Sequence, residues 1–378
     1  MSMKNSKGIT LVALVVTVVI LLILAGVSVN LVLGENGLIK YAQKAKEATV
    51  QESENDNKQI ENVTDELSEN LTGTKTKNGA PIPEGYYYVG GIRDKGVVIS
   101  DSSDDENKYA DKENVGKDLS GNQWVWVPVN NSSNLYEKSN EGISILENSN
   151  VKTYLYSKGE YRGMPGGTLN REPDISLVYD TDENIKKAGF ESLEQMAKTV
   201  TNNYEKMINS IEKYNGFYVA RYELSENGLK KGKVITGNGW HDSYKLCKNW
   251  GKGSQVETDM IWGTQWDAIC SWLSSCGYDI WDSSSWGNYI NNDAEGAGKP
   301  QETGYCESWK ANNIYDFAGN FYEVTQETSS YELYNRVIRG GYYSYSGKFK
   351  PAREIYDNLK PGNVGYEFLT TRVVMYIK

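Results

Sequence analysis

The cysteines and the single histidine are the side chains of this sequence with the most obvious chemistry. Cys247, Cys270, Cys276 and Cys306 all lie in the C-terminal half, and His241 is the only histidine. The sequence does not favour a zinc site, because no CxxC pair occurs and one histidine adds few ligands. If this half lies outside the cell, the cysteines can form two disulfides in any of three pairings, and Cys270 with Cys276 is the nearest pair in sequence.

The remaining reactive groups have no recognisable catalytic spacing. The 50 Asp and Glu residues are scattered, so no pair stands out as a glycosidase dyad. Neither a phosphate-binding loop nor a GxSxG nucleophile turn occurs. The net charge of −10 argues against a nucleic-acid-binding protein, which needs clustered Lys and Arg to neutralise phosphates.

Aromatic residues with a polar group are unusually frequent. The chain has 28 Tyr and 10 Trp but only 6 Phe. Tyr and Trp combine a large apolar ring with a hydrogen-bonding group, which suits them to contact surfaces. This composition favours a binding surface over a core that is merely apolar.

An uncharged apolar run of roughly 25 residues, 9–33, follows Lys4 and Lys7 near the N-terminus. It is long enough to cross a bilayer as a helix. The lysines place the N-terminus in the cytoplasm and everything after Leu33 outside. Burial in a globular core disagrees with the terminal position of the run, and a cleaved signal has an apolar part of only about 7–15 residues. We therefore expect a single-pass cell-membrane protein with an extracellular C-terminal domain.

Residues 1–8, before this run, have the features of a leader. The junction KGITLV resembles the leader of type IV pilins and pseudopilins, which a peptidase cuts after a glycine. The resemblance implies cleavage between Gly8 and Ile9 and association with other pilins in a pilus. That family usually has glutamate at the fifth mature residue, where this chain has Ala13.

Helix-forming residues continue over 34–71, with apolar residues in approximate helical spacing. This pattern predicts a helix that continues into water. The pilin resemblance implies a spine against which a head domain packs, and a solvated stalk is the alternative. The polar segment 72–80 contains turn residues and predicts a linker.

Residues 81–378 form the predicted head domain. Short aromatic and β-branched runs predict strands at IPEGYYYVGG, KGVVIS, NQWVWVPV and GFYVARYE. Helical spacing predicts helices at 190–214 and 264–273, so we expect an α+β fold.

Six phrases follow one another in this domain: GFYVARYE (216–223), TQWD (264–267), NIYDFAGNFYEVT (313–325), RVIRGG (336–341), ARE (352–354) and VGYEFLTTRVV (364–374). In content and order they resemble the formylglycine-generating enzyme family and its relatives. The resemblance covers roughly 81–378 and implies a C-type-lectin fold. A shared fold does not fix a shared function.

Glycines in two of these phrases predict sharp turns. Gly319, Gly340 and Gly341 fit positions where the backbone needs a positive φ or a close approach. In the related family, the positions of Asn320 and Glu323 can bind calcium through oxygen ligands, so the resemblance implies a calcium site here. A plain turn would use the same residues.

Three arginines of the same phrases are candidates for buried planar donors. Arg339, Arg353 and Arg372 can tie loops to carboxylates such as Glu323 or Glu354. A structural role for them is favoured over a catalytic one.

The resemblance does not extend to the catalytic residues of that family. The formylglycine-generating enzymes hold copper with two cysteines shortly after the RGG phrase, whereas this chain has no cysteine after Cys306. Related ergothioneine-type oxygenases use several histidines, and this chain has one. The sequence therefore predicts a protein that is not an enzyme of either kind.

The residues after RGG have an amino-acid composition similar to that of antibody paratopes. In paratopes, Tyr supplies rigid contact area, and Ser and Asn adapt their hydrogen bonds. The predicted ligand-binding residues are Tyr342, Tyr343, Ser344, Tyr345, Ser346, Ile355, Tyr356, Asp357, Asn358 and Asn363. This segment resembles the variable region of diversity-generating retroelement target proteins, which lies on the same lectin-type fold. An ordinary tyrosine-rich β surface is the alternative.

Three functions are compatible with these observations. The main hypothesis is a surface-displayed receptor or adhesin that binds a protein or glycan. The second is a structural minor pilin or pseudopilin, and the third is an enzyme of the sulfatase-modifying type. They differ in what they require: a ligand on the tyrosine face, presence in filaments, or copper-dependent turnover.

Overall fold

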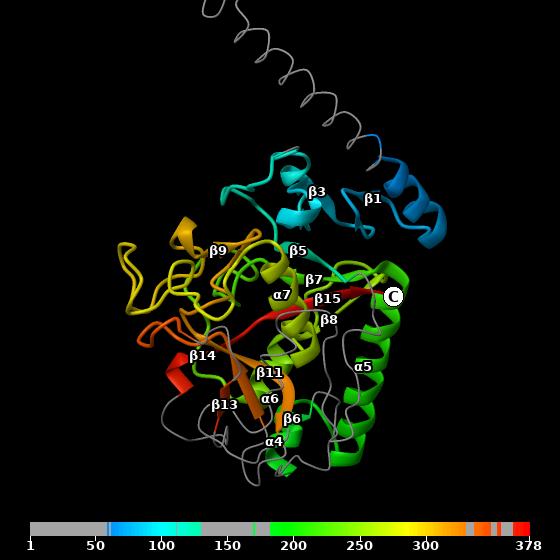
Figure 1. Ribbon diagram of the computed structural model, residues 1–378. Helices are drawn as coiled ribbons and strands as arrows, with labels where there is room; N and C mark the ends of the chain where they lie inside the picture. Colours follow the sequence, from blue (N-terminus) through cyan, green and yellow to red (C-terminus); the bar gives the residue numbers. More distant parts are fainter. Residues whose placement is uncertain are drawn as a thin grey trace, which may run out of the picture. The chain divides into compact units, whose positions relative to one another are not determined.

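The computed structural model describes residue 59 and residues 62–110, 112–129, 169–170, 182–329, 336–348, 354–356 and 366–378 (Figure 1). The chain divides into two compact units, Met1–Thr64 and Asp65–Lys378, and both large sheets belong to the second. The predicted leader 1–8, the predicted transmembrane helix 9–33 and most of the predicted spine lie outside the described residues. Among the residues that are described, no helix has the length and apolarity needed to cross a membrane.

The second unit has the predicted α+β composition, with a six-stranded sheet at its centre. All neighbouring strands of this sheet are antiparallel. Their order is β3 (Tyr87–Gly90), β4 (Val98–Ser100), β5 (Gln123–Pro128), β7 (Gly216–Ala220), β15 (Val373–Ile377) and β8 (Val256–Met260). The central strands β5, β7 and β15 read as continuous apolar runs because the sheet is covered on both faces: every residue of β7 and β15 is buried.

A second sheet carries the C-terminal phrases. Its order is β13 (Glu354–Tyr356), β12 (Arg336–Arg339), β11 (Tyr322–Ser329) and β14 (Leu369–Thr371), and β6 (Leu169–Asn170) pairs with the far end of β11. The β11–β14 pair is parallel, and the other pairs are antiparallel. The strands β14 and β15 follow each other directly, so the chain passes from the second sheet into the first at Arg372.

Two long helices cover these sheets, as the spacing predicted. Helix α5 (Leu193–Tyr214) begins at Ser192, whose hydroxyl accepts a hydrogen bond from Gln195 N, and ends at Asn215 in the left-handed conformation. It packs against β7 and β15, and Figure 1 shows it along one side of the six-stranded sheet. Helix α7 (Gly263–Ser275) contacts β5 in one sheet and β11 in the other.

Short elements complete the described part. The sequence did not predict helices α4 (Asp182–Lys187) and α6 (Trp240–Leu246), which are too short for a clear period. The other short elements are β1 (Thr76–Lys77), β2 (Ala80–Pro81), η1 (Arg93–Lys95), η2 (Ser103–Asp105), η5 (Glu307–Trp309), β9 (Lys310–Ala311), β10 (Ile314–Tyr315) and η6 (Tyr366–Phe368).

The N-terminal boundary of the head differs from the expected one at 81. Residues 62–72 are helical, and the segment 72–80, expected to be a linker, contains β1 and its turn. The buried carboxylate of Asp65 accepts hydrogen bonds from Asn78 N and Gly79 N, at 2.8 and 2.7 Å. This carboxylate holds the turn to the helix, so the compact unit begins at Asp65.

All four cysteines are free thiols. Cys270 lies within α7 and Cys276 caps its C-terminus. The Cα atoms of Cys270 and Cys276 are six helical residues apart, which separates them by about 9 Å along the axis. This is more than the roughly 7 Å between Cα atoms that a disulfide can span. The pairing that looked nearest in sequence is therefore excluded by this helix.

Candidate functional site

The predicted binding residues Tyr342 to Ser346 lie in one loop, 340–348, which begins where β12 ends. Gly340 and Gly341 have positive φ values of 87° and 79°, so the chain turns sharply here, as the sequence predicted. Directly before the turn, the buried guanidinium of Arg339 donates to Asp267 of α7 at 3.0 Å. The start of the loop is thus fixed to the core.

Backbone hydrogen bonds hold this loop on two sides. Tyr343 N donates to Asn320 O at 3.0 Å, beside the turn that leads into β11. On the other side, Ile290 N donates to Tyr345 O at 3.1 Å, and Gly347 N donates to the side chain of Asn291 at 3.0 Å. A loop tied to two neighbouring segments presents its side chains with little freedom left to lose on binding.

The tyrosine rings of this loop form one aromatic cluster around Tyr342. Its ring centroid lies 4.7 Å from that of Tyr345 and 5.1 Å from that of Tyr343, both nearly perpendicular. It also stacks on Phe368 at 5.3 Å and lies 5.2 Å from the buried ring of Tyr322. We call Tyr342, Tyr343 and Tyr345 together the aromatic face.

The three rings differ in how far they reach solvent. Tyr345 is 49% exposed, whereas Tyr342 and Tyr343 are half-buried. Ser344 is exposed and Ser346 is half-buried. The three rings are therefore at least partly exposed to solvent. Tyr342 packs against Tyr322 and Phe368, and Tyr345 is the most exposed of the three.

The other predicted binding residues lie outside this loop in the sequence. Ile355 and Tyr356 lie on β13, where their backbones pair with Val337 and Arg336 of β12. Asp357, Asn358 and Asn363 lie outside the described residues. The loop 340–348 is thus the part of the predicted site whose side chains the structure describes.

Two exposed apolar residues beside the loop were missed by the sequence reasoning. Ile290 is 65% exposed and is hydrogen-bonded through its backbone to Tyr345. Trp281 is 41% exposed and precedes Asp282, whose backbone forms a bridge with Lys348. The sequence could have indicated them, since 281–292 reads WDSSSWGNYINN and is likewise rich in Tyr, Trp, Ser and Asn.

The oxygens of the predicted calcium ligands are occupied by protein donors. Asn320 Oδ1 accepts from Asn288 Nδ2 at 3.0 Å and from Gln301 N at 3.1 Å. Both carboxylate oxygens of Glu323 accept from Arg372 Nε, at 2.9 and 3.0 Å. A guanidinium stands where a cation would bind, so the geometry of these two residues gives calcium no support.

Buried carboxylates surround this arginine. Burial raises the pKa of Glu323, and hydrogen bonds from Arg372 act against that rise. Glu223, which accepts from Asn320 Nδ2 at 2.6 Å, has a pKa well above its ordinary value, first because of burial and then because Asp316 and Glu323 lie near. This arrangement ties strands together rather than exposing a reactive group.

Groups suited to metal catalysis do not gather in the described part of the chain. There, no three His, Cys, Asp or Glu side chains come together in a way that could hold a metal ion. Burial raises the pKa of the Cys247 and Cys270 thiols to about 12, which makes them poor nucleophiles.

Comparison with known proteins adds no relative. No protein-family model matches the chain, and no curated protein and no solved structure matches it either.

Proposed function

We propose that this chain is a membrane-anchored, outward-facing protein whose aromatic face binds a protein or glycan. The observation that carries the proposal is the exposed ring of Tyr345, packed against Tyr342 on a loop fixed on two sides. Rigid, partly exposed aromatic rings lose little entropy on binding and supply large contact area. Ile290, whose backbone is hydrogen-bonded to Tyr345, adds an exposed apolar residue next to this loop.

We also propose that the head domain has a C-type-lectin fold of the formylglycine-generating-enzyme type. The basis is the resemblance of its six sequence phrases to that family. The antiparallel pairing of β7 with the last strand, β15, and the close association of α5 with both strands support it. The likeness of the C-terminal segment to retroelement-diversified binding proteins supports a ligand-binding role for its loops. The apolar run 9–33 supplies the proposed anchor.

A screen for ligands tests the proposal with the full-length protein in detergent. The probes are a printed oligosaccharide array and a phage library of random peptides. Tyr343→Ser and Tyr345→Ser are each expected to weaken the binding of a retained saccharide or peptide at least about tenfold, the effect of one central aromatic contact. The variants avoid Tyr342 because its ring packs against Tyr322 and Phe368, and its loss would lower stability as well.

Tyr305→Ser is the matched control. Tyr305 is 41% exposed but lies outside the loop 340–348 and stacks on Trp309. Binding and melting temperature should stay as in the parent. If the parent retains no probe better than Tyr343→Ser and Tyr345→Ser do, or if those variants bind as well as the parent, the aromatic face is not the binding surface.

A structural pilin is the second candidate, and one observation favours it. Leu67 and Leu71 lie four residues apart in the helix 62–72 and are 58% and 76% exposed. Apolar side chains on one helix face are typical of helix packing. Recovery of the chain in filaments sheared from the cell surface, together with no ligand for the aromatic face, would favour this function over the first.

A further inference from the structure

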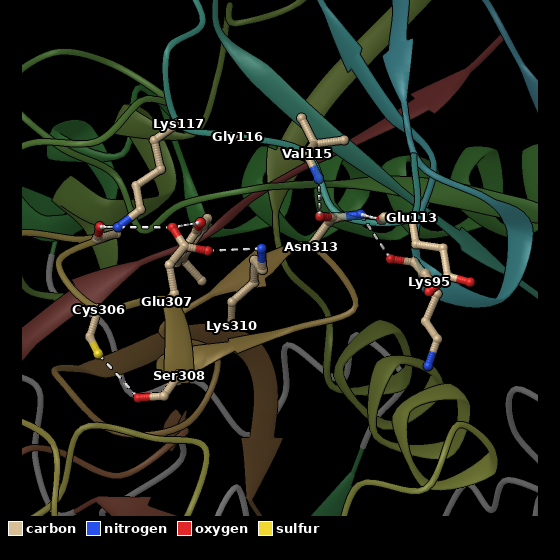
Figure 2. Close-up of polar contacts among 12 residues, drawn as sticks. Lys95, Glu113, Val115, Gly116, Lys117, Cys306, Glu307, Ser308, Lys310 and Asn313 are labelled. Carbon is tan, nitrogen blue, oxygen red and sulfur yellow. Dashed lines mark hydrogen bonds and ion pairs between the residues drawn. The ribbon is translucent and has the colours of Figure 1, made fainter. Parts of the chain in front are cut away.

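A surface carboxylate, Glu307, is held between two lysines from different segments. Lys117 precedes β5 and contacts Glu307 Oε1 at 3.0 Å, while Lys310 of β9 contacts Oε2 at 2.9 Å. The hydroxyl of Tyr315 donates to Oε1 at 2.7 Å. Figure 2 shows the Glu307 side chain lying between Lys117 and Lys310. The three donors thus meet both oxygens of one planar carboxylate.

Burial differs between the two sides of this contact. The side chains of Lys310 and Lys117 are 10% and 24% exposed, whereas that of Glu307 is 57% exposed. Burial raises the pKa of Glu307, but hydrogen bonds from Lys310, Tyr315 and Lys117 outweigh it and lower the pKa to about 2. When Glu307 withdraws, water can solvate its carboxylate, because its side chain is already more than half exposed. Leaving the lysines without an anion is costly, because they are largely buried. The two lysines therefore require a carboxylate partner, but that partner can be a group other than Glu307.

Three cationic groups lie close to the ring of Tyr315. The charged ends of Lys117 and Lys310 each lie 5.5 Å from its ring centroid, and that of Arg221 lies 5.2 Å away. The guanidinium of Arg221 donates to backbone carbonyls of Asn313, Gly116 and Val115 and to the amide oxygen of Gln123, all neutral groups.

Glu307 is the carboxylate that contacts both lysines. The carboxylate of Asp316, the residue after Tyr315, accepts its hydrogen bonds from Thr303 and Gly304. In the described part of the chain, Lys117 and Lys310 therefore share the single carboxylate of Glu307.

The lysine-bearing loop is held in place independently of Glu307. The buried side chain of Asn313 donates to the carbonyls of Lys95, Gly96 and Glu113 and accepts from Val115 N at 3.1 Å, two residues before Lys117 (Figure 2). Lys117 Nζ also donates to Gly304 O at 2.9 Å. The donors would keep their positions if Glu307 moved away.

We propose that Lys117, Lys310 and Tyr315 form a binding site for an external carboxylate, which Glu307 fills as an internal ligand until it is displaced. The exposed stem of Glu307 allows it to swing into solvent while the external carboxylate takes over both lysine contacts and the tyrosine hydrogen bond. The ligand class is a small molecule or sugar with a carboxylate group. The site is separate from the aromatic face.

Removing the internal ligand tests this site. Glu307→Ala in the full-length protein is titrated with sodium acetate at constant ionic strength, with sodium chloride as the reference, and the melting temperature is followed. Acetate is expected to raise the melting temperature of Glu307→Ala with a half-saturation at least about tenfold lower than that of the parent. Glu307→Gln keeps the shape without the charge, and it should fall between the two.

The lysine requirement decides the outcome. Glu307→Ala combined with Lys310→Met should lose the response to acetate, with Lys310→Met alone as the folding control. Sodium glucuronate forms a second arm: tighter binding than acetate assigns an acidic sugar, and equal binding assigns the carboxylate group alone. No response in Glu307→Ala and Glu307→Gln, or a response that persists without Lys310, would overturn the site.

Discussion

At the residue scale, Asp316 is a buried carboxyl group whose ionisation affects the stability of the fold. Burial raises its pKa from about 3.8 to about 6, against the hydrogen bonds from Gly304 N and the Thr303 hydroxyl that act to lower it. Its Oδ1 atom has no hydrogen-bond partner within the described part of the chain. The folded state therefore binds a proton more tightly than the unfolded state does, and stability falls as pH rises from about 4 to about 6.

Asp316→Asn should remove this contribution. The φ of 54° at this position lies in the left-handed region that asparagine also adopts readily, so the backbone should tolerate the change. The variant is expected to be more stable than the parent at pH 7.5 by about 1–3 kcal/mol, and the difference should shrink towards pH 4.5. Urea unfolding at several pH values measures it, and a difference that does not vary with pH would contradict the assignment.

At the element scale, Arg372 joins the two sheets. It lies between β14 and β15 and donates to Glu323 of β11, to Ala220 O of β7 and to Tyr315 O of β10. All of these groups are buried, so each hydrogen bond replaces one that the group would make with water in the unfolded chain. One side chain thus fixes the place where the chain passes from one sheet into the other.

Arg372→Met should destabilise the protein by about 3–5 kcal/mol, because it leaves the buried carboxylate of Glu323 unpaired. Combining it with Glu323→Gln should recover part of the loss, since no buried charge then remains. Urea unfolding compares the three proteins. Lys233→Met, which breaks an exposed ion pair with Glu226, serves as the control and should leave stability nearly unchanged. A control loss as large as that of Arg372→Met would contradict this role of Arg372.

Some of the elements were predictable from the sequence, whereas strands such as β8, β11 and β15 were not predicted. Apolar runs predicted β3, β4, β5 and β7, and helical spacing predicted α5 and α7, because these elements are long or strongly patterned. The turns at Gly319 and Gly340 were expected from glycine chemistry and have the expected positive φ. The compact unit begins at Asp65, before the predicted start of the head at 81, and Asp65 acts on residues thirteen and fourteen positions away, which no local pattern indicates.

Side-chain partners were less predictable, because they depend on which segments the fold brings together. Arg372 pairs with Glu323 as expected, whereas the pairing of Arg339 with Asp267 of α7 was not indicated by the sequence. Arg353 lies outside the described residues. The contributions of Ile290 and Trp281, and the contact of Lys117 with Glu307 nearly two hundred positions later, also arise only from tertiary structure.

At the scale of the whole molecule, the proposed function joins an anchor to a binding surface. The apolar run 9–33 would hold the chain in a membrane, and the loop 340–348 would present the aromatic face to a ligand. The carboxylate site at Lys117 and Lys310 lies in other segments and need not act in the same event. Substituting Tyr345 should therefore leave the response of Glu307→Ala to acetate intact.

Footprinting of the ligand complex tests the binding role of the aromatic face most directly. The full-length protein is exposed to hydroxyl radicals with and without a ligand recovered from the oligosaccharide or peptide screen, and side-chain oxidation is measured by mass spectrometry. We predict strong protection of Tyr345 and Ile290, which are 49% and 65% exposed in the free protein, and no change at Tyr305. Protection at Tyr305 with Tyr345 still fully reactive would contradict this role.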